Sequence, residues 1–413
     1  MKKQNSHLLN EVGLNKPWHK TKLGYRLLYK YARFAFNLFY PVIHIEGREN
    51  IPEGKPVIFA ANHQNALMDA LAMLFAANKP VYFLARADIF KKKRVANILK
   101  FLQMMPVYRL RDEVDIIEKN ETTFKQTAAI LASGNYLGIL PEGTHTPIKQ
   151  LQTLKKGICR IAFETVAQAD DNADLHIVPV GLDYSDYHTQ GSSLVVIFGK
   201  SIPVTDFLGV YHENPNRAVT LLRDKLASSL KEIMIDINNQ EEYYFIHQTS
   251  EQIADNFLAV EDKKHPEKFI WQRYKLIKQE SERLLSLLKH NPVEYNRFKA
   301  SRLSLKSLEY TNGKGSGGSG VDRPLWQVLF YKIITVLALL MNFAPFALAG
   351  WFSNRVQDKQ FIGSFKFVTS LILFPLWYML MFIIILTTVG ILPALISVAA
   401  ASLFALLKLK YTN

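Results

Sequence analysis

Short apolar blocks alternate with longer periodic stretches between residues 42 and 236. Runs such as "PVIFA" and "VYFLA" have the length of buried strands, and apolar positions in the stretches between them recur with the 3.6-residue period of a helix. Gly134 ends one of these stretches, "TTFKQTAAILASG", as a helix-stop signal. The alternation predicts an α/β domain over residues 42–236, and it predicts helix from residue 206 to about 235.

An amphipathic segment precedes this domain. In "WHKTKLGYRLLYKYARFAFNLFY" the basic residues share one helix face, and these are Lys22, Arg26, Lys30 and Arg33. A neighbouring apolar stripe contains Leu23, Leu27, Tyr31, Phe34 and Leu38. The two stripes predict a membrane-interface helix within residues 1–41, and an ordinary amphipathic helix packed on the domain is the alternative.

Two segments of different composition follow the α/β domain. Residues 237–312 are charged and rich in aromatic side chains, which favours a helical region. Residues 313–323 begin with "GKGSGGSG", a composition typical of a flexible linker. The linker separates the helical region from everything that comes after it.

The remaining residues, 324–413, are strongly apolar. The runs at 324–352 and 367–407 are each long enough to cross a bilayer core, which takes about 20 helical residues. The second run is too long for one crossing, and Gly390 and Pro393 mark a break within it. We therefore expect a transmembrane region of two or three helices and an integral membrane protein.

The number of crossings affects the predicted topology. Three crossings would place Arg355 and Lys359 on the side opposite the α/β domain, against the tendency of basic loops to stay inside. A re-entrant first run around "NFAPFALAG" resolves the conflict, and so does a different number of crossings.

The net charge and the cysteine content limit the kinds of partner and cross-link that we expect for this protein. The 413 residues carry a formal net charge of +14, which favours anionic partners such as lipid headgroups and phosphorylated substrates. Neither zinc-finger spacing nor a recognition helix is present, so we expect no nucleic acid partner. Cys159 is the only cysteine, so neither an intrachain disulfide nor a thiolate metal cluster is expected. A single cysteine suits a catalytic domain on the reducing, cytoplasmic face of a membrane. The N-terminal stretch "MKKQNSHLLNEVG" lacks the apolar core of a cleavable secretion signal, so none is expected.

The stretch "ANHQNALMDA" places an imidazole and a carboxylate directly after a predicted strand. His63 lies in the expected loop, and Asn65 is a suitable first residue for the following helix. Asp69 then falls in the first helical turn, where the helix dipole favours a carboxylate. An Asp that accepts a hydrogen bond from Nδ1 of a histidine leaves Nε2 free as a general base. A metal-binding pair or a purely structural pair is the alternative.

Two further blocks contain groups that suit an anion. In "ILPEGTHT", Glu142, Gly143 and Thr144 follow a strand, and a glycine turn with a hydroxyl suits a phosphate oxygen. Arg109 follows the predicted strand "MPVY", at the sheet edge where sites collect. A polar β-turn and a surface ion pair, respectively, are the structural alternatives.

Four ordered blocks, "NHQNALMD", "PVYR", "LPEGTHT" followed by "LKKG", and "IVPVGLDY", resemble the phospholipid/glycerol acyltransferase superfamily over roughly residues 45–205. The resemblance implies a mixed central sheet flanked by helices. It implies that His63 deprotonates the acceptor hydroxyl and that Asp69 orients His63. The implied headgroup-binding residues are Arg109, Glu142, Gly143, Thr144, His145, Lys155 and Lys156.

Two departures from the family pattern refine this interpretation. Five residues separate His63 from Asp69 instead of four, which resembles the glycerol-3-phosphate/dihydroxyacetone-phosphate acyltransferase subgroup. His145 occupies a position where the family usually has Arg, and this shifts the expected phosphate contact toward Arg109 or Lys149.

The resemblance implies a membrane-bound O-acyltransferase of phospholipid biosynthesis. Its donor would be acyl-CoA or acyl carrier protein, and its acceptor glycerol 3-phosphate or dihydroxyacetone phosphate. Acylation of 1-acyl-glycerol 3-phosphate is the close alternative, and a lipid-binding scaffold without turnover is an alternative of another class. No cofactor and no metal are expected, and the partners are membrane lipids and the two substrates.

Overall fold

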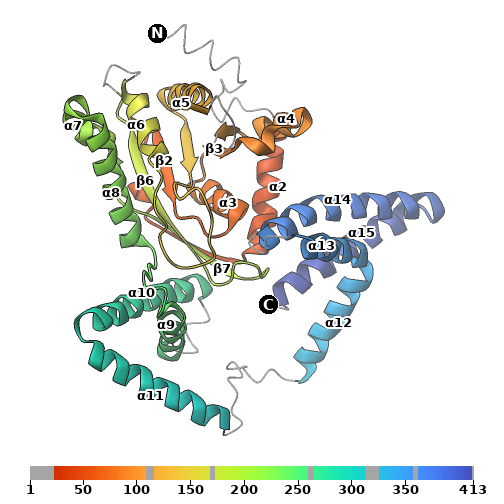
Figure 1. Ribbon diagram of the computed structural model, residues 1–413. Coiled ribbons are helices and arrows are strands. Elements are labelled where there is room, and N and C mark those ends of the chain that lie inside the picture. The colour runs from red at the N-terminus through yellow and green to blue at the C-terminus, as the bar shows by residue number, and fades with distance from the viewer. Residues whose placement is uncertain are drawn as a thin grey trace. The chain divides into compact units, whose positions relative to one another are not determined.

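A twisted eight-stranded sheet forms the centre of the α/β domain (Figure 1). The computed structural model describes residues 23–107, 116–167, 173–258, 265–311, 325–356 and 361–411. The strands are β1 (Val42–Glu46), β2 (Val57–Ala61), β3 (Val81–Arg86), β4 (Met104–Val107), β5 (Tyr136–Ile139), β6 (His176–Tyr184), β7 (Ser193–Phe198) and β8 (Ile202–Pro203). They are ordered β1-β7-β6-β2-β5-β3-β4, and β8 pairs with β6.

The sheet is mixed, as the family resemblance implies. Strand β2 pairs in parallel with both β5 and β6, and β3 pairs in parallel with both β4 and β5. Strands β7 and β8 run antiparallel to β6. The carboxyl ends of β2, β3, β4, β5 and β6 therefore lie along one edge of the sheet, where loops from distant parts of the chain converge.

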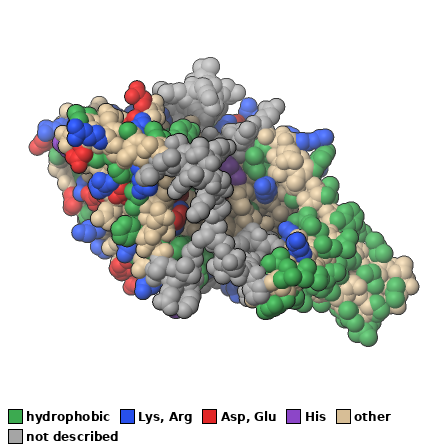
Figure 2. Space-filling model, turned by 90° about the horizontal axis from the view of Figure 1, so that it is seen from below, with side chains coloured by type: hydrophobic (Ala, Val, Ile, Leu, Met, Phe, Trp, Pro, Cys, Tyr) green, Lys and Arg blue, Asp and Glu red, His purple; other side chains and the backbone are tan. Residues whose placement is uncertain are grey.

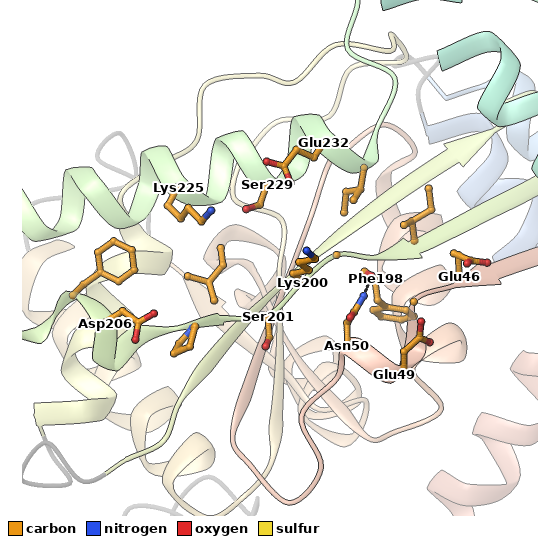
Figure 3. A pocket seen from close by; sticks show the side chains of 17 residues that line it. Glu46, Glu49, Asn50, Phe198, Lys200, Ser201, Asp206, Lys225, Ser229 and Glu232 are labelled. Carbon is orange, nitrogen blue, oxygen red and sulfur yellow. Dashed lines mark hydrogen bonds between the residues drawn. The ribbon is translucent and has the colours of Figure 1, made fainter. Parts of the chain in front are cut away.

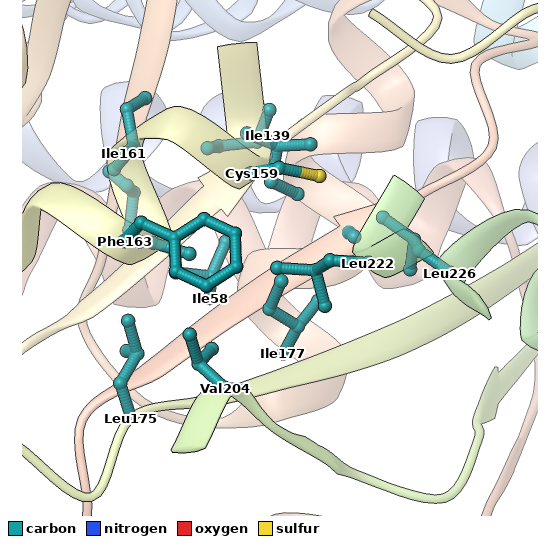
Figure 4. Close-up of a cluster of buried hydrophobic side chains, with 14 of the residues drawn as sticks. Ile58, Ile139, Cys159, Ile161, Phe163, Leu175, Ile177, Val204, Leu222 and Leu226 are labelled. Carbon is teal, nitrogen blue, oxygen red and sulfur yellow. The ribbon is translucent and has the colours of Figure 1, made fainter. Parts of the chain in front are cut away.

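Helices cover both faces of this sheet. The helical elements of the domain are η2 (Arg48–Asn50), α3 (Ala66–Ala77), η3 (Ala87–Phe90), α4 (Lys93–Phe101), α5 (Ile116–Ala132), α6 (Gly157–Ala167), η4 (Val204–Phe207), α7 (Leu208–Glu213) and α8 (Pro215–Ile233). One face packs against α5, α6 and α8, and Figure 4 shows Ile58 and Ile177 of the sheet facing Phe163 and Leu222. Close packing of these side chains excludes water and fixes the positions of the strand ends.

The other face of the sheet carries α3, and helix α2 (Leu23–Phe39) packs on α3. The rings of Tyr29 and Phe36 lie 5.3 and 5.2 Å from the ring of Phe75 on α3. Tyr25, Tyr29 and Phe36 are buried, whereas Leu27 and Phe34 are 58% and 55% exposed. The helix is therefore held by its buried aromatic residues, which the sequence did not predict as a packing stripe. Most of the predicted apolar stripe, which includes Leu27 and Phe34, faces outward.

Residues 206 to about 235 are almost entirely helical, as predicted, but they form several elements. Instead of one continuous element, η4, α7 and α8 follow one another. Asn214 has an extended backbone, and its side chain accepts a hydrogen bond from the backbone N–H of Arg217. Pro215 occupies the first turn of α8, where its missing N–H costs nothing. An asparagine cap followed by proline ends one helix and starts the next.

Three helices follow the α/β domain, within the region predicted to be helical. They are α9 (Tyr243–Phe257), α10 (Pro266–His290) and α11 (Pro292–Thr311). Helices α9 and α10 pack through buried side chains, and the hydroxyl of Ser281 donates to that of Ser250 at 3.1 Å. Glu242 accepts from Tyr295 and Lys299 at 2.8 and 2.7 Å, which fastens α11 to the start of α9.

The C-terminal helices are α12 (Leu325–Met341), α13 (Phe343–Asn354), α14 (Ile362–Thr388) and α15 (Ile391–Tyr411). By length and composition, α14 and α15 are each able to cross a membrane, and Gly390 separates them as predicted. Hydrophobic side chains cover much of this part of the chain (Figure 2). Helices α12 and α13 meet at a bend of 82°, which is the geometry of a broken span or a re-entrant loop. The described residues therefore contain two helices long and apolar enough to span a membrane, or up to three candidate spans if the bent pair counts as one.

Candidate active site

His63 and Asp69 meet directly beyond the carboxyl end of β2. The strand ends at Ala61, His63 lies in the following loop, and Asp69 lies in the first turn of α3, as the sequence predicts. Nδ1 of His63 is 2.8 Å from Oδ2 of Asp69. The His63 side chain is 13% exposed and the Asp69 side chain is fully buried. Asp69 is thus inaccessible to solvent, and only the imidazole of the pair is partly exposed.

The loop between them is a tight turn built around the carboxylate. Oδ2 of Asp69 also accepts hydrogen bonds from the backbone N–H groups of Gln64 and Asn65, at 2.8 and 2.7 Å. Ala66 has a φ of +45°, a left-handed conformation that is uncommon for a residue with a Cβ. This left-handed turn fits five residues between His63 and Asp69 while the backbone still converges on the carboxylate.

Tyr184, the last residue of β6, supplies a further hydrogen bond to Asp69. Its hydroxyl donates to Oδ1 at 2.8 Å, so both carboxylate oxygens are engaged. Because a carboxylate that collects these donors acts only as an acceptor, the proton of the His63–Asp69 bond lies on Nδ1. Nε2 of His63, which has no hydrogen-bond partner among the described residues, then presents a lone pair. The arrangement is that of an oriented general base.

The loop after β5 lies against His63. Oε1 of Glu142, which is 2% exposed, accepts a hydrogen bond from the backbone N–H of His63 at 3.1 Å. The backbone N–H of Thr146 donates to the carbonyl of His63 at 3.1 Å, and the rings of His63 and His145 are 5.1 Å apart. The two sequence blocks that contain His63 and Glu142 therefore form one site.

Glu142 differs from its expected position in the headgroup site. Its carboxylate is buried beneath the His63 backbone, whereas the resemblance implies contact with a soluble headgroup. Thr144, by contrast, is exposed, and Gly143 makes the turn with a φ of +72°. The N–H of Gly143 donates to the carbonyl of Leu140 at 3.1 Å, inside the turn. The residue type at position 143 follows from this left-handed conformation, which favours glycine.

The basic residues of the expected headgroup site have different environments. Lys155 and Lys156 are exposed just before α6. The side chain of Lys155 lies beside Gly143, because its Cγ would be 3.6 Å from a Cβ atom at position 143. Lys149 is 4% exposed, and its ammonium binds the carboxylate of Asp183. This ion pair contradicts a role for Lys149 as a phosphate contact, because its charge is already neutralised. Arg109 lies outside the described residues, two positions after the end of β4.

Several residues that support the site were not predicted from the sequence. Asn62 is buried and clamps β2 to β6, since its side chain bonds the N–H and the carbonyl of Leu182 at 2.7 and 3.0 Å. Gln64 is also buried and donates to the carbonyl of Ile148 at 2.9 Å. The only signal for Asn62 and Tyr184 was their position at the ends of the recognised blocks.

A separate cavity of about 600 Å³ lies between β1, the β7–β8 turn and α8 (Figure 3). Lys200, Lys225 and Glu232 are among the side chains around it. Strand β7 runs antiparallel to β6, with Leu194 opposite Tyr184 and Phe198 opposite Val180. The end of β7 is therefore directed away from the edge that holds His63, and none of the predicted site residues that the structure describes lines this cavity.

Comparison with known proteins identifies similar sequences. The model of a family described as Acyltransferase matches residues 42–183. Over 150 residues the chain is 25% identical to the chloroplastic 1-acyl-sn-glycerol-3-phosphate acyltransferase of Arabidopsis thaliana, covering 36% of this chain and 39% of the relative. Over 198 residues it is 25% identical to the 1-acyl-sn-glycerol-3-phosphate acyltransferase of Borreliella burgdorferi, covering 47% and 73%.

Two further similarities have lower identity. The glycerol-3-phosphate O-acyltransferase 1 of Saccharomyces cerevisiae is 23% identical over 307 residues, covering 52% of this chain and 40% of the relative. The chain thus spans less than half the length of the plant and yeast relatives. The crystal structure of the 1-acyl-sn-glycerophosphate acyltransferase of Thermotoga maritima has 19% identity and a TM-score of 0.38, covering 55% of this chain and 87% of that structure.

Proposed function

We propose that residues 42–183, which match the model of a family described as Acyltransferase, transfer a fatty acyl group from an acyl thioester to the hydroxyl of a phosphorylated glycerol. The observation that carries the proposal is the buried Asp69 carboxylate, which binds Nδ1 of the partly exposed His63 side chain and leaves Nε2 without a partner among the described residues. Donors to Asp69 come from two loop N–H groups and from Tyr184, so the imidazole is held before substrate arrives.

In the proposed reaction, Nε2 of His63 takes the proton of the acceptor hydroxyl as its oxygen attacks the thioester carbonyl. A new C–O bond forms, and the imidazolium is stabilised by Asp69. The tetrahedral intermediate then collapses, its C–S bond breaks, and the departing thiolate receives the proton from His63. The products are an acyl ester and a free thiol, and the imidazole returns to its neutral form.

The second part of the proposal assigns the phosphate of the acceptor to the turn after β5. Thr144 offers an exposed hydroxyl beside His145, and Lys155 passes the same turn. A hydroxyl and an ammonium suit phosphate oxygens. Arg109 and Lys156 complete the proposed set, and Glu142 acts on the backbone of His63 as a positioning residue.

We propose glycerol 3-phosphate or dihydroxyacetone phosphate as the acceptor and acyl-CoA or acyl carrier protein as the donor. The yeast relative, named as a glycerol-3-phosphate O-acyltransferase, supports glycerol 3-phosphate as the acceptor. Two relatives named as 1-acyl-sn-glycerol-3-phosphate acyltransferases favour the longer acceptor as the second candidate. Helices α14 and α15 would hold the domain at the cytoplasmic face of a membrane, where acyl chains partition.

The test is an acyl-transfer assay with the full-length protein in lipid nanodiscs. Each labelled acyl thioester is offered with each of the three acceptors in turn. We expect His63→Ala to lower kcat by about 10³-fold or more, because the general base is removed. His212→Ala, an exposed histidine on α7, is the matched control and should leave transfer unchanged. Transfer by folded His63→Ala at near the normal rate would reject the mechanism, and no transfer to any acceptor would favour a lipid-binding scaffold.

A further inference from the structure

Helix α4 contributes none of its nine residues to the buried core. Its apolar side chains Val95, Ile98 and Phe101 lie on one side of the helix and are 38%, 58% and 38% exposed. Lys93 and Lys100 lie on the other side. A helix that is apolar on one side and basic on the other, with neither side covered, is typical of a segment that lies in a membrane interface.

The positive charge around α4 is concentrated, and most of it has no ion pair with the part of the chain that the structure describes. Residues 86–102 contain six Lys or Arg side chains and a single acidic one, Asp88, which binds Arg86. Lys91, Lys92, Lys93, Arg94 and Lys100 have no ion pair with any residue that the structure describes. Ile89, on η3 just before this cluster, is 41% exposed. The segment from η3 to the end of α4 therefore exposes both apolar side chains and an excess of basic ones.

Helix α2, which touches the end of α4, also exposes apolar and basic side chains. The ring of Phe101, at the end of α4, lies 6.0 Å from the ring of Tyr25 near the start of α2, and Figure 1 shows the two helices meeting at their ends. On α2, the exposed Leu23, Leu27 and Phe34 lie beside Arg26 and Lys30. Two helices from separate parts of the chain thus expose the same combination of side chains.

The α4 surface also has a defined place in the fold. Helix α4 and η3 follow the carboxyl end of β3, and β2 and β3 are both parallel to β5. The surface therefore begins at the same sheet edge to which β2 brings His63. A bilayer bound there would lie next to the site at which the proposed reaction takes place.

We propose that η3, α4 and the outer stripe of α2 form a docking surface for a bilayer with anionic headgroups. The apolar side chains enter the boundary between headgroups and acyl chains, and the lysine and arginine side chains bind the anionic phosphates. The exposed apolar side chains favour a bilayer over a soluble acidic protein, since a purely electrostatic contact would leave Ile98 and Phe101 in water. The inference concerns lipid contact alone and holds whether or not acyl transfer is observed.

A fluorescent label at residue 98 tests the proposal. Full-length Ile98→Cys is labelled with an environment-sensitive dye; Cys159 is fully buried and does not compete for it. The protein is placed in nanodiscs of zwitterionic lipid, with or without anionic phosphatidylglycerol, that contain a nitroxide-quencher lipid. We expect strong quenching in anionic discs, weaker quenching in zwitterionic discs, and loss of the difference at high salt. Leu221→Cys on α8, which is 40% exposed, is the position control and should show no lipid dependence.

A charge variant identifies the side chains responsible. Each basic side chain near an anionic surface strengthens binding about fivefold, so replacing Lys91, Lys92 and Lys93 by Gln should weaken the anionic preference on the order of 100-fold. Replacing the exposed Arg217, Lys225 and Lys231 of α8 by Gln removes the same charge elsewhere and should have no effect. Because all six side chains are exposed, both variants should keep the normal Tm.

Three outcomes would overturn the proposal. One is a label at residue 98 that stays in water in both kinds of disc. The second is quenching that is equal with and without phosphatidylglycerol, or that survives the three lysine substitutions. The third is a response of the label to acidic acyl carrier protein in zwitterionic discs, which would assign the surface to a protein partner.

Discussion

The hydroxyl of Tyr184 donates a 2.8 Å hydrogen bond to Oδ1 of Asp69 across 115 positions of the chain. Oδ2 of the same carboxylate binds Nδ1 of His63. Both oxygens of Asp69 are therefore held in a fully buried environment, where a hydrogen bond to a charged group contributes about 1.5–3 kcal/mol. The end of β6 thus determines how firmly the imidazole is oriented.

Tyr184→Phe should lower kcat about tenfold, because a loss of about 1.4 kcal/mol of transition-state stabilisation corresponds to that factor. The acceptor KM should change little, since Tyr184 contacts Asp69 and not the proposed acceptor site. Tyr211→Phe is a suitable control, because the Tyr211 ring stacks on Phe163 in the core on the opposite side of the sheet. An unchanged kcat in folded Tyr184→Phe would show that Asp69 is positioned without this hydroxyl.

Glu142 should behave as a positioning residue. Its carboxylate binds the backbone N–H of His63 from a buried position, so Glu142→Ala should lower kcat about tenfold or more with little effect on the acceptor KM. Glu142→Gln retains an acceptor oxygen and should recover part of the activity. A variant that mainly raises the acceptor KM would instead support direct contact with the headgroup.

Thr144→Ala should raise the acceptor KM about three- to tenfold and leave kcat within about twofold, because a group that holds the phosphate throughout the reaction contributes uniform binding. Arg109→Ala should act in the same direction. Thr153→Ala, another exposed threonine, serves as the control. Steady-state kinetics with varied acceptor concentration separate the two parameters, and a loss confined to kcat would contradict a headgroup role.

Cys159 should be inert in the folded protein. Burial raises the pKa of its thiol to about 12, from an ordinary value of 9.0. At pH 8 the thiolate fraction falls on the order of 1,000-fold, and maleimide reacts with the thiolate. Mass spectrometry should detect almost no labelling in buffer and complete labelling in denaturant. Rapid labelling under native conditions would show that α6 opens readily.

Local pattern predicted most of the fold. The run "VYFLAR" is β3, residue for residue, and Gly134 follows α5 with a φ of +76°. The place of Asp69 in the first turn of α3 also followed from sequence, because capping residues and apolar spacing act within one or two helical turns. The division at Asn214–Pro215 was missed although its signal is local, since the surrounding apolar period continues across it.

The contacts that complete the site could not be predicted in this way. Every residue of β6 except Asp183 is buried, so its sequence has no alternation to show which side chain faces Asp69. The bond from Tyr184 to Asp69 exists because β6 pairs with β2, and the Lys149–Asp183 ion pair exists because the loop after β5 folds back over β6. Strand order is set by the packing of the whole core rather than by neighbouring residues.

The sequence by itself determined most of the elements, the apolar C-terminal helices and the candidate pair His63 and Asp69, because these depend on spacing along the chain. Tertiary structure decided which buried groups hold His63, that Lys149 is neutralised, and that the outer stripe of α2 stays uncovered beside α4. Such contacts join residues about 35 to 115 positions apart, and only the order of the strands brings them within hydrogen-bonding distance.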